Sequence, residues 1–208
     1  MAIKSISEFY SFSLFIFDLD NTIYKEEDYL FQAYIAIARK FAKEFPEYNE
    51  QYLFQILIDL QLKYGREKLF DRFLIKINLD SSYIPICLNI LRSFKPEKKI
   101  EVNETVKTIL SNLKNLKTPV FILTNGNVMQ QKNKIKNINW GGLDNYLHFV
   151  FASDIEPKPS SAGVEYILNK SGTGKDKAVF IGDSEVDQLC AENSGIDFIS
   201  INNLFKLI

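Results

Sequence analysis

The chain of 208 residues is 46% apolar and 25% charged, and its 25 lysines and arginines nearly balance its 26 aspartates and glutamates. These values are typical of a compact globular domain with room for one sizeable insertion. The near-zero net charge argues against broad nucleic-acid binding, which needs a concentrated basic surface.

The sequence contains no recognisable membrane span or secretory signal. The first apolar run, Phe12–Phe17, is too short to cross a bilayer. A secretory signal would need basic, long apolar and small-residue segments in that order, and this order is not found. Cys87 and Cys190 lie in apolar helical surroundings, so we expect both to be buried and reduced. We therefore expect a cytoplasmic protein with no membrane partner.

Strands and helices are predicted to alternate over most of the chain. Near-continuous apolar runs suit strands that are covered on both faces, as in a parallel sheet. The five runs are Ser13–Phe17, Val120–Leu123, Phe149–Phe151, Ala178–Ile181 and Phe198–Ile201. The helical patterns are Val102–Leu116, Val164–Asn169 and Glu185–Asn193. Pro159 is well placed for the first turn of the second helix. This alternation predicts a doubly wound, Rossmann-like α/β core with right-handed crossovers.

The stretch between the first and second strands has a different pattern, which predicts four consecutive helices. Their ranges are Asp28–Phe45, Glu50–Tyr64, Glu67–Ile77 and Ser81–Phe94. Tyr, Phe, Leu and Ile recur there at helical spacing, and Pro and Gly residues separate the segments. Because the block directly follows the first strand, it reads as an inserted helical cap domain. The predicted domains are a Rossmann-like core of residues 1–23 and 100–208 and a helical cap of residues 24–99.

Polar residues follow each of the first four predicted strands. The first strand leads into Asp18 and Asp20, the second into Thr124-Asn125-Gly126, and the third, after a short loop, into Lys158. The fourth leads into Gly182-Asp183, with Asp187 four residues further on. Ligands of open parallel sheets bind in the crevice beyond the carboxyl ends of the strands. We therefore expect all four groups to meet in one place.

These residue types together favour phosphoryl transfer. The carboxylates of Asp18, Asp20, Asp183 and Asp187 would repel one another unless a cation lay among them. Hard oxygen ligands favour Mg²⁺. A lysine and a hydroxyl would let the same pocket hold an anion. In phosphoryl transfer, positioning and charge neutralisation supply most of the catalysis.

Each motif also has a simpler interpretation when it is read alone. Asp18 and Asp20 could form a turn after a strand, and Thr124-Asn125-Gly126 is a common turn sequence. Gly182-Asp183 with Asp187 could be a turn followed by a helix N-cap. The occurrence of four such groups in this order, each after a strand, favours a functional site.

With these motifs the sequence resembles the haloacid dehalogenase superfamily, from Phe12 to about Ile201. The family's first motif is matched by Asp18, Asp20 and Thr22, its second by Thr124, its third by Lys158 and its fourth by Gly182-Asp183 with Asp187. An insertion between the first and second motifs looks like the family's helical type-one cap. The resemblance implies a hydrolase of the phosphatase branch.

The resemblance also implies a role for each acidic residue. Asp18 would attack phosphorus and form an acyl phosphate. Asp20 would protonate the leaving oxygen and then activate water, and its backbone carbonyl would ligate Mg²⁺. The carboxylates of Asp18 and Asp183 would be the other direct protein ligands. Asp187 would help to hold the metal, directly or through water.

The remaining motif residues are implied to bind the phosphoryl group. Thr124 and the backbone amides of Asn125 and Gly126 would bind its oxygens, and Lys158 would neutralise the nucleophile and the phosphate. Asp20 separates the branches of the family, because dehalogenating members lack an acid there. We expect a small phosphorylated metabolite as the substrate, a sugar phosphate or a nucleotide. A sugar-phosphate mutase and a catalytically silent, phosphate-binding regulatory protein remain alternatives, and the oligomeric state cannot be read from the sequence.

Overall fold

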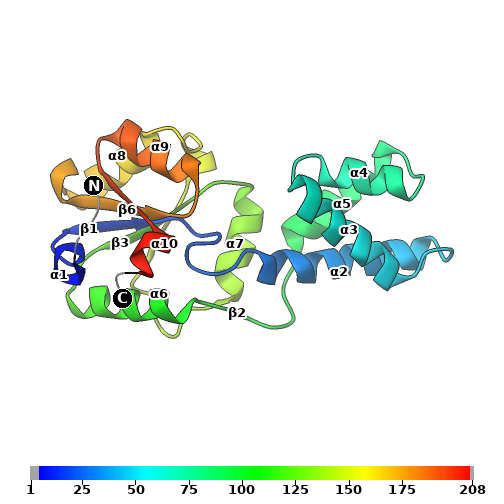
Figure 1. Ribbon diagram of the computed structural model, residues 1–208, viewed down its shortest axis with the longest axis horizontal. Helices are drawn as coiled ribbons and strands as arrows, with labels where there is room; N and C mark the ends of the chain where they lie inside the picture. The colour runs from blue at the N-terminus through cyan, green and yellow to red at the C-terminus, as the bar shows by residue number, and fades with distance from the viewer. Residues whose placement is uncertain (1–4, 207–208) are drawn as a thin grey trace. The chain divides into compact units, whose positions relative to one another are not determined.

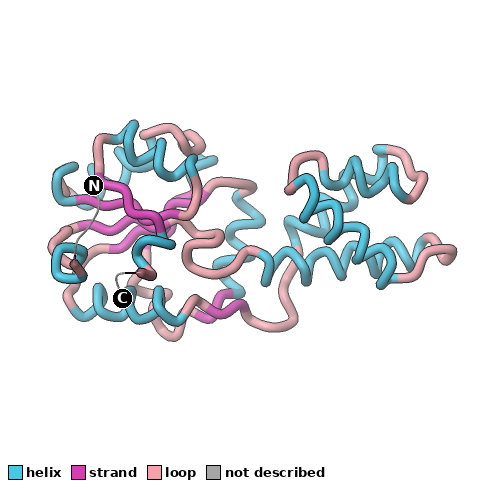
Figure 2. Tube along the Cα trace, viewed as in Figure 1, coloured by secondary structure: helices cyan, strands magenta, loops and turns pink. Residues whose placement is uncertain are grey.

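The computed structural model describes residues 5–206 of the chain and forms two compact units (Figure 1). Within the described residues, the core unit comprises 5–26, Ile100–Gln131 and 138–206, and the cap unit comprises Glu27–Lys99 and Lys132–Asn137. The outer ends of the predicted core, residues 1–4 and 207–208, lie outside the described residues. Figure 2 shows the strands gathered in the core unit, while the cap unit consists of helices and loops.

A parallel five-stranded sheet in the order β5-β3-β1-β6-β7 organises the core unit. The strands are β1 (Leu14–Phe17), β3 (Val120–Thr124), β5 (His148–Phe151), β6 (Ala178–Gly182) and β7 (Asp197–Ser200). Each predicted strand is confirmed to within one residue at either end. In the register of the sheet, Phe17 at the end of the central strand lies beside Ile122 and Ile181. The carboxyl ends of β1, β3 and β6 are therefore neighbours, and the chain order reverses at β1, where such folds bind ligands.

Helices cover both faces of the sheet (Figure 1). α8 (Ala162–Ser171) and α9 (Glu185–Ser194) lie on one face, and α6 (Glu104–Asn115) lies on the other. Leu14 and Ile16 of β1 belong to the apolar cluster on the α8–α9 side. Because side chains alternate along a strand, Phe15 and Phe17 face the opposite side, where Phe15 packs edge-on against Phe9. The doubly wound α/β prediction is confirmed.

The position predicted for Pro159 was wrong. α8 begins at Ala162, with Ser161 as its N-cap residue, so Pro159 precedes the helix. The chain forms a turn there instead: the N–H of Ser160 donates to the carbonyl of Pro157, and the Lys158–Pro159 peptide bond is cis. Lys158 therefore belongs to this turn, which precedes the first residue of α8.

The cap unit contains the four predicted helices with altered ends. They are α2 (Glu27–Glu44), α3 (Glu50–Tyr64), α4 (Leu69–Lys76) and α5 (Ile84–Ser93). α4 starts two residues later than predicted because Lys68 adopts a left-handed conformation with φ 51°. Residues Ser81–Tyr83 form a separate 3₁₀ turn before α5. Tyr34, Phe41 and Phe73 lie in the interior of this unit, as expected for aromatic residues at helical spacing.

α7 (Val128–Asn137) was not predicted from the sequence; it begins in the core unit and ends in the cap unit. Its sequence is mostly polar and lacks the apolar period that reveals amphipathic helices. The short elements α1 (Ile6–Phe9), β2 (Ile100–Glu101), β4 (Ile138–Asn139) and α10 (Ile201–Leu204) were also not predicted. Between residues 5 and 206, no helix has the length and apolar character that a membrane crossing requires.

Candidate active site

The candidate site lies at the carboxyl ends of β1, β3 and β6. Asp18 follows β1 directly, and its N–H donates to the carbonyl of Ile181 at 2.9 Å, so the main chain there stays tied to β6. Thr124 is the last residue of β3, and Asp183 follows the last residue of β6. The backbone hydrogen bonds of the sheet thus hold these three positions.

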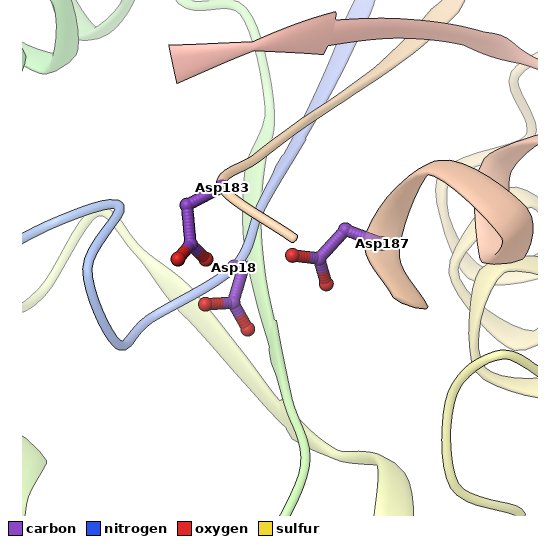
Figure 3. A group of neighbouring side chains, drawn as sticks. All are labelled: Asp18, Asp183 and Asp187. Carbon is purple, nitrogen blue, oxygen red and sulfur yellow. The ribbon is translucent and has the colours of Figure 1, made fainter. Parts of the chain in front are cut away.

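Three of the predicted acidic residues form a cluster. Asp18, Asp183 and Asp187 each offer a carboxylate oxygen, and these oxygens lie within 4.8 Å of one another. Figure 3 shows the three carboxylates turned toward a common space. Asp18 and Asp187 are buried, whereas Asp183 is exposed. The fourth predicted acid, Asp20, is not a member of this group of three.

A buried lysine links two members of the cluster. The ammonium of Lys158 donates to Asp18 Oδ1 at 2.5 Å and to Asp187 Oδ1 at 2.6 Å. Burial alone would lower the pKa of Lys158, but the charges of Asp18 and Asp187 more than offset it, and the pKa is raised. Lys158 therefore remains a cation.

Two of the carboxylates, those of Asp18 and Asp183, are hard to ionise. Burial raises the pKa of Asp18 to about 7, with Asp187 and Asp20 adding to the rise and Lys158 opposing it. The pKa of Asp183 is also raised, first because its carboxyl group is partly desolvated although the residue as a whole is exposed, and then by the charge of Asp187. A further positive charge at this place would offset the cost of ionising both residues.

Asp187 is held by a capping box at the start of α9. Its N–H donates to Ser184 Oγ, while the N–H and the hydroxyl of Ser184 donate to Asp187 Oδ2 at 3.2 and 2.6 Å. Asp187 is therefore both a helix-capping residue and a member of the acidic cluster. The interpretation of this motif as a helix N-cap and its interpretation as part of a group of acidic residues both apply to Asp187. Ser184 was not singled out, although the Ser-x-x-Asp spacing signals such a box.

Gly182 makes room for this carboxylate. A Cβ atom at residue 182 would lie 2.6 Å from Asp187 Cβ and from Asp187 Oδ2, closer than such contacts occur. Any larger residue would push Asp187 out of the cluster. The fourth motif therefore needs a glycine at residue 182 because the side chain of Asp187 packs directly against it.

Asn125 holds the main chain of Lys158. Its side-chain Oδ1 accepts from the N–H of Lys158 at 2.9 Å, and its Nδ2 donates to the carbonyl of Lys158 at 3.0 Å. Its neighbours are also held locally: the Thr124 hydroxyl donates to the carbonyl of Asn125, and the Ser153 hydroxyl donates to that of Gly126. The side chain of Asn125 is thus engaged with the main chain of Lys158.

Asp20 is half-buried, and side chains from outside the four motifs contact both of its carboxylate oxygens. The hydroxyl of Tyr24 donates to Asp20 Oδ1 at 2.5 Å, and the amide of Gln131 donates to Asp20 Oδ2 at 3.1 Å. Sequence reasoning missed both partners. Tyr24 stood at the start of the predicted cap, and Gln131 stood in a polar segment with no predicted element, so neither carried a recognisable signal.

The donor set fits a divalent cation. Three carboxylates meet here, and within the described part of the chain the ammonium of Lys158 pairs with two of them, Asp18 and Asp187, so negative charge remains in excess when all three are ionised. Carboxylate oxygens are the hard ligands that Mg²⁺ prefers. Asp187 already uses one oxygen for Lys158 and the other for Ser184. Asp18 and Asp183 are therefore the carboxylates best suited to contact a metal directly.

Comparison with solved structures shows the same fold in several proteins. One is a HAD-superfamily hydrolase of subfamily IA from Geobacter sulfurreducens, with 21% identity, a TM-score of 0.66, and coverage of 91% of this chain and 87% of that chain. Another is YfnB from Bacillus subtilis bound to magnesium, with 19% identity, a TM-score of 0.61, and coverage of 90% and 85%. A third is CbbY from Rhodobacter sphaeroides in complex with xylulose-1,5-bisphosphate, with 14% identity, a TM-score of 0.60, and coverage of 91% and 85%.

Sequence comparison identifies the family. Comparison with curated proteins gives no match. The model of the haloacid dehalogenase-like hydrolases, in contrast, matches residues 15–201, nearly the whole chain. The match agrees with the four motifs, the doubly wound core and the helices inserted after the first strand. The chain belongs to the haloacid dehalogenase-like hydrolases.

Proposed function

We propose that the chain is a Mg²⁺-dependent phosphatase that hydrolyses a small phosphomonoester through an aspartyl phosphate at Asp18. The contact of Asp18 Oδ1 with the Lys158 ammonium at 2.5 Å, beside Asp183, carries the proposal. A buried carboxylate next to a fixed cation is a nucleophile whose charge is balanced as a phosphate dianion approaches. Asp20, two residues further on, supplies the acid that ester cleavage needs and halide departure does not.

In the first step, Asp18 attacks phosphorus and the bond from phosphorus to the leaving oxygen breaks. Asp20 gives its proton to that oxygen, so an alcohol leaves and Asp18 carries the phosphoryl group. In the second step, Asp20 takes a proton from water as the water attacks phosphorus. The bond between phosphorus and Asp18 breaks, which releases phosphate and restores the free carboxylate of Asp18.

The other residues position and neutralise these groups. Lys158 balances the charge of Asp18 and of the phosphoryl oxygens, and Asp187 holds Lys158 in place. We propose that Thr124 and the backbone amides of Asn125 and Gly126 bind the phosphoryl oxygens. Asp18, Asp183 and the backbone carbonyl of Asp20 would hold Mg²⁺, with Asp187 supporting the site. When bound, Mg²⁺ would supply positive charge that stabilises the phosphoryl group in the transition state.

A small phosphorylated metabolite, a sugar phosphate or a nucleotide, is the proposed substrate class. The bisphosphate in the CbbY structure supports phosphorylated sugars as ligands of this fold. A mutase would use the same two aspartates but would pass the phosphoryl group to a second sugar hydroxyl in place of water. Measuring free phosphate distinguishes the two, because only hydrolysis releases it.

The test compares hydrolysis of p-nitrophenyl phosphate, and then of a panel of phosphorylated metabolites, with Mg²⁺ and with a chelator. We expect hydrolysis only with Mg²⁺, loss of turnover in Asp18→Asn, and near wild-type activity in the exposed control Asp144→Asn. Mass spectrometry of the acid-quenched enzyme should find a phosphoryl group on the peptide containing Asp18. Turnover by a folded Asp18→Asn protein would rule out Asp18 as the nucleophile. If the wild type released no phosphate from any compound of the panel, the proposed phosphatase activity would be excluded.

A further inference from the structure

Two side chains outside the four motifs bind the two oxygens of Asp20. Tyr24 is 2% exposed and donates its hydroxyl to Oδ1, and Gln131 is 4% exposed and donates its amide to Oδ2. A carboxylate bound at both oxygens by buried groups has a fixed orientation. We propose that Tyr24 and Gln131 are positioning residues for the general acid Asp20, an inference that rests on the proposed phosphatase function.

The orientation of the Gln131 amide follows from its partners. Its Nε2 lies 3.1 Å from Asp20 Oδ2 and 2.7 Å from the carbonyl oxygen of Asn125. Both partners are acceptors in an ionised site, so the NH₂ group must face them, since the reverse orientation would bring three oxygens together. Gln131 Oε1 is buried and has no hydrogen-bond partner among residues 5–206. An unpaired buried acceptor costs free energy, so stability alone does not favour glutamine here.

Gly126 lets the glutamine approach. A Cβ atom at residue 126 would lie 3.0 Å from Gln131 Nε2, and Gly126 has a φ of 112°, which other residues rarely adopt. Through the carbonyl of Asn125, Gln131 also ties Asp20 to the residue whose side chain holds the main chain of Lys158. The general acid and the catalytic lysine are thereby placed relative to one another.

The two partners differ in what they can do when Asp20 carries a proton. The amide of Gln131 can only donate toward Oδ2, which disfavours a proton on that oxygen. The hydroxyl of Tyr24 can donate to Oδ1 when Asp20 is ionised and accept from it when Asp20 is protonated. The hydroxyl of Tyr24 can therefore keep its contact with Asp20 in either form, while the amide of Gln131 holds Oδ2 in one orientation.

The role can be tested through the leaving group of the substrate. Nitrophenolate departs readily without a proton, whereas phenolate gains more from general acid catalysis, and the two esters have similar shapes. kcat/KM reports the steps up to formation of the aspartyl phosphate, so it isolates the acid step. We therefore compare kcat/KM for p-nitrophenyl phosphate and phenyl phosphate in Tyr24→Phe and Gln131→Met.

Both variants should lose about 10- to 100-fold in kcat/KM for phenyl phosphate, part of the contribution of a general acid, and less than about 3-fold for p-nitrophenyl phosphate. Asp20→Asn should show the same selectivity with a larger loss. The controls are Tyr146→Phe, which removes a hydroxyl that donates to the carbonyl of Thr118, and Gln55→Met, which removes an amide that donates to Asp59. Neither control should change the ratio of the two kcat/KM values.

Equal losses on both esters, or no loss, in folded variants would overturn the positioning role while leaving the phosphatase intact. If the wild type hydrolysed neither ester nor any metabolite of the panel, the proposed phosphatase function would be rejected. The positioning role of Tyr24 and Gln131 would then be rejected as well. Should Gln131→Met fail to fold, Gln131→Asn keeps a polar amide that is one methylene too short to reach Asp20. It should show the same selective loss.

Discussion

Asp18→Asn should make the metal-free protein more stable at alkaline pH. The pKa of Asp18 is raised from 3.8 to about 7, mainly by burial. The unfolded chain therefore ionises Asp18 at lower pH than the folded chain does. Between these two pKa values the folded state binds more protons, so stability falls as pH rises. Asparagine resembles the neutral form of the residue and removes this loss.

The size of the effect follows from the same two values. A pKa raised from 3.8 to about 7 makes ionisation of Asp18 cost about 4 kcal/mol more in the folded chain than in the unfolded one. Near pH 8 the variant should gain about this much, and near pH 5 it should gain less than about 2 kcal/mol. The gain should vanish below pH 3.8, where both states are protonated.

The assay is urea unfolding of both proteins in a chelating buffer at several pH values, followed by circular dichroism. The difference in the free energy of unfolding between variant and wild type should grow from pH 5 to pH 7 and then level off. The exposed control Asp144→Asn should change stability by no more than about 0.5 kcal/mol at any of these pH values. A variant that is less stable than the wild type near pH 8, or a difference that does not depend on pH, would refute the reasoning.

Substitutions at three further positions test the cluster. Lys158→Met should lower the free energy of unfolding by about 3–5 kcal/mol in metal-free buffer near pH 8, because Asp18 and Asp187 lose their shared cation. It should also bind Mg²⁺ more tightly by calorimetry, and weaker binding would contradict the charge argument. Gly182→Ala should lower stability by about 1–3 kcal/mol and slow turnover, because its Cβ would displace Asp187; wild-type values for both would reject the packing role of this glycine. Ser184→Ala should cost about 1 kcal/mol in urea unfolding through loss of the capping box, whereas Ser184→Thr should retain most of it. Equal losses in the two serine variants would exclude the cap as the cause.

The core was predictable because its signals are local. Each strand is a short apolar run ended by a polar residue, and the sheet places those ends together. Asp18 and Asp183 lie 165 positions apart in the sequence, yet adjoining strands end beside both, and their oxygens fall within 4.8 Å. The Ser-x-x-Asp spacing of the capping box was equally readable, although its meaning for Asp187 required the position of Gly182.

The partners of Asp20 could not be predicted because their signal is tertiary. Gln131 lies on α7, whose sequence of glutamines, lysines and asparagines has no apolar stripe. Nothing near Gln131 in the sequence indicates that its amide meets a carboxylate 111 positions away. The engagement of Asn125 with the main chain of Lys158 is hidden in the same way, since an asparagine before glycine reads as a turn.

The division of α7 matters for anyone who exchanges caps between members of this family. Lys132–Asn137 belongs to the cap unit although it lies more than thirty positions beyond Lys99. Within that unit, Asn133 Nδ2 donates to the carbonyl of Arg92 at 2.7 Å, and the buried ammonium of Lys134 lies 5.3 Å from the ring of Tyr29. A chimaera that transplants only Glu27–Lys99 would separate Arg92 and Tyr29 from Asn133 and Lys134. A well-folded hybrid should therefore take both Glu27–Lys99 and Lys132–Asn137 from the same donor.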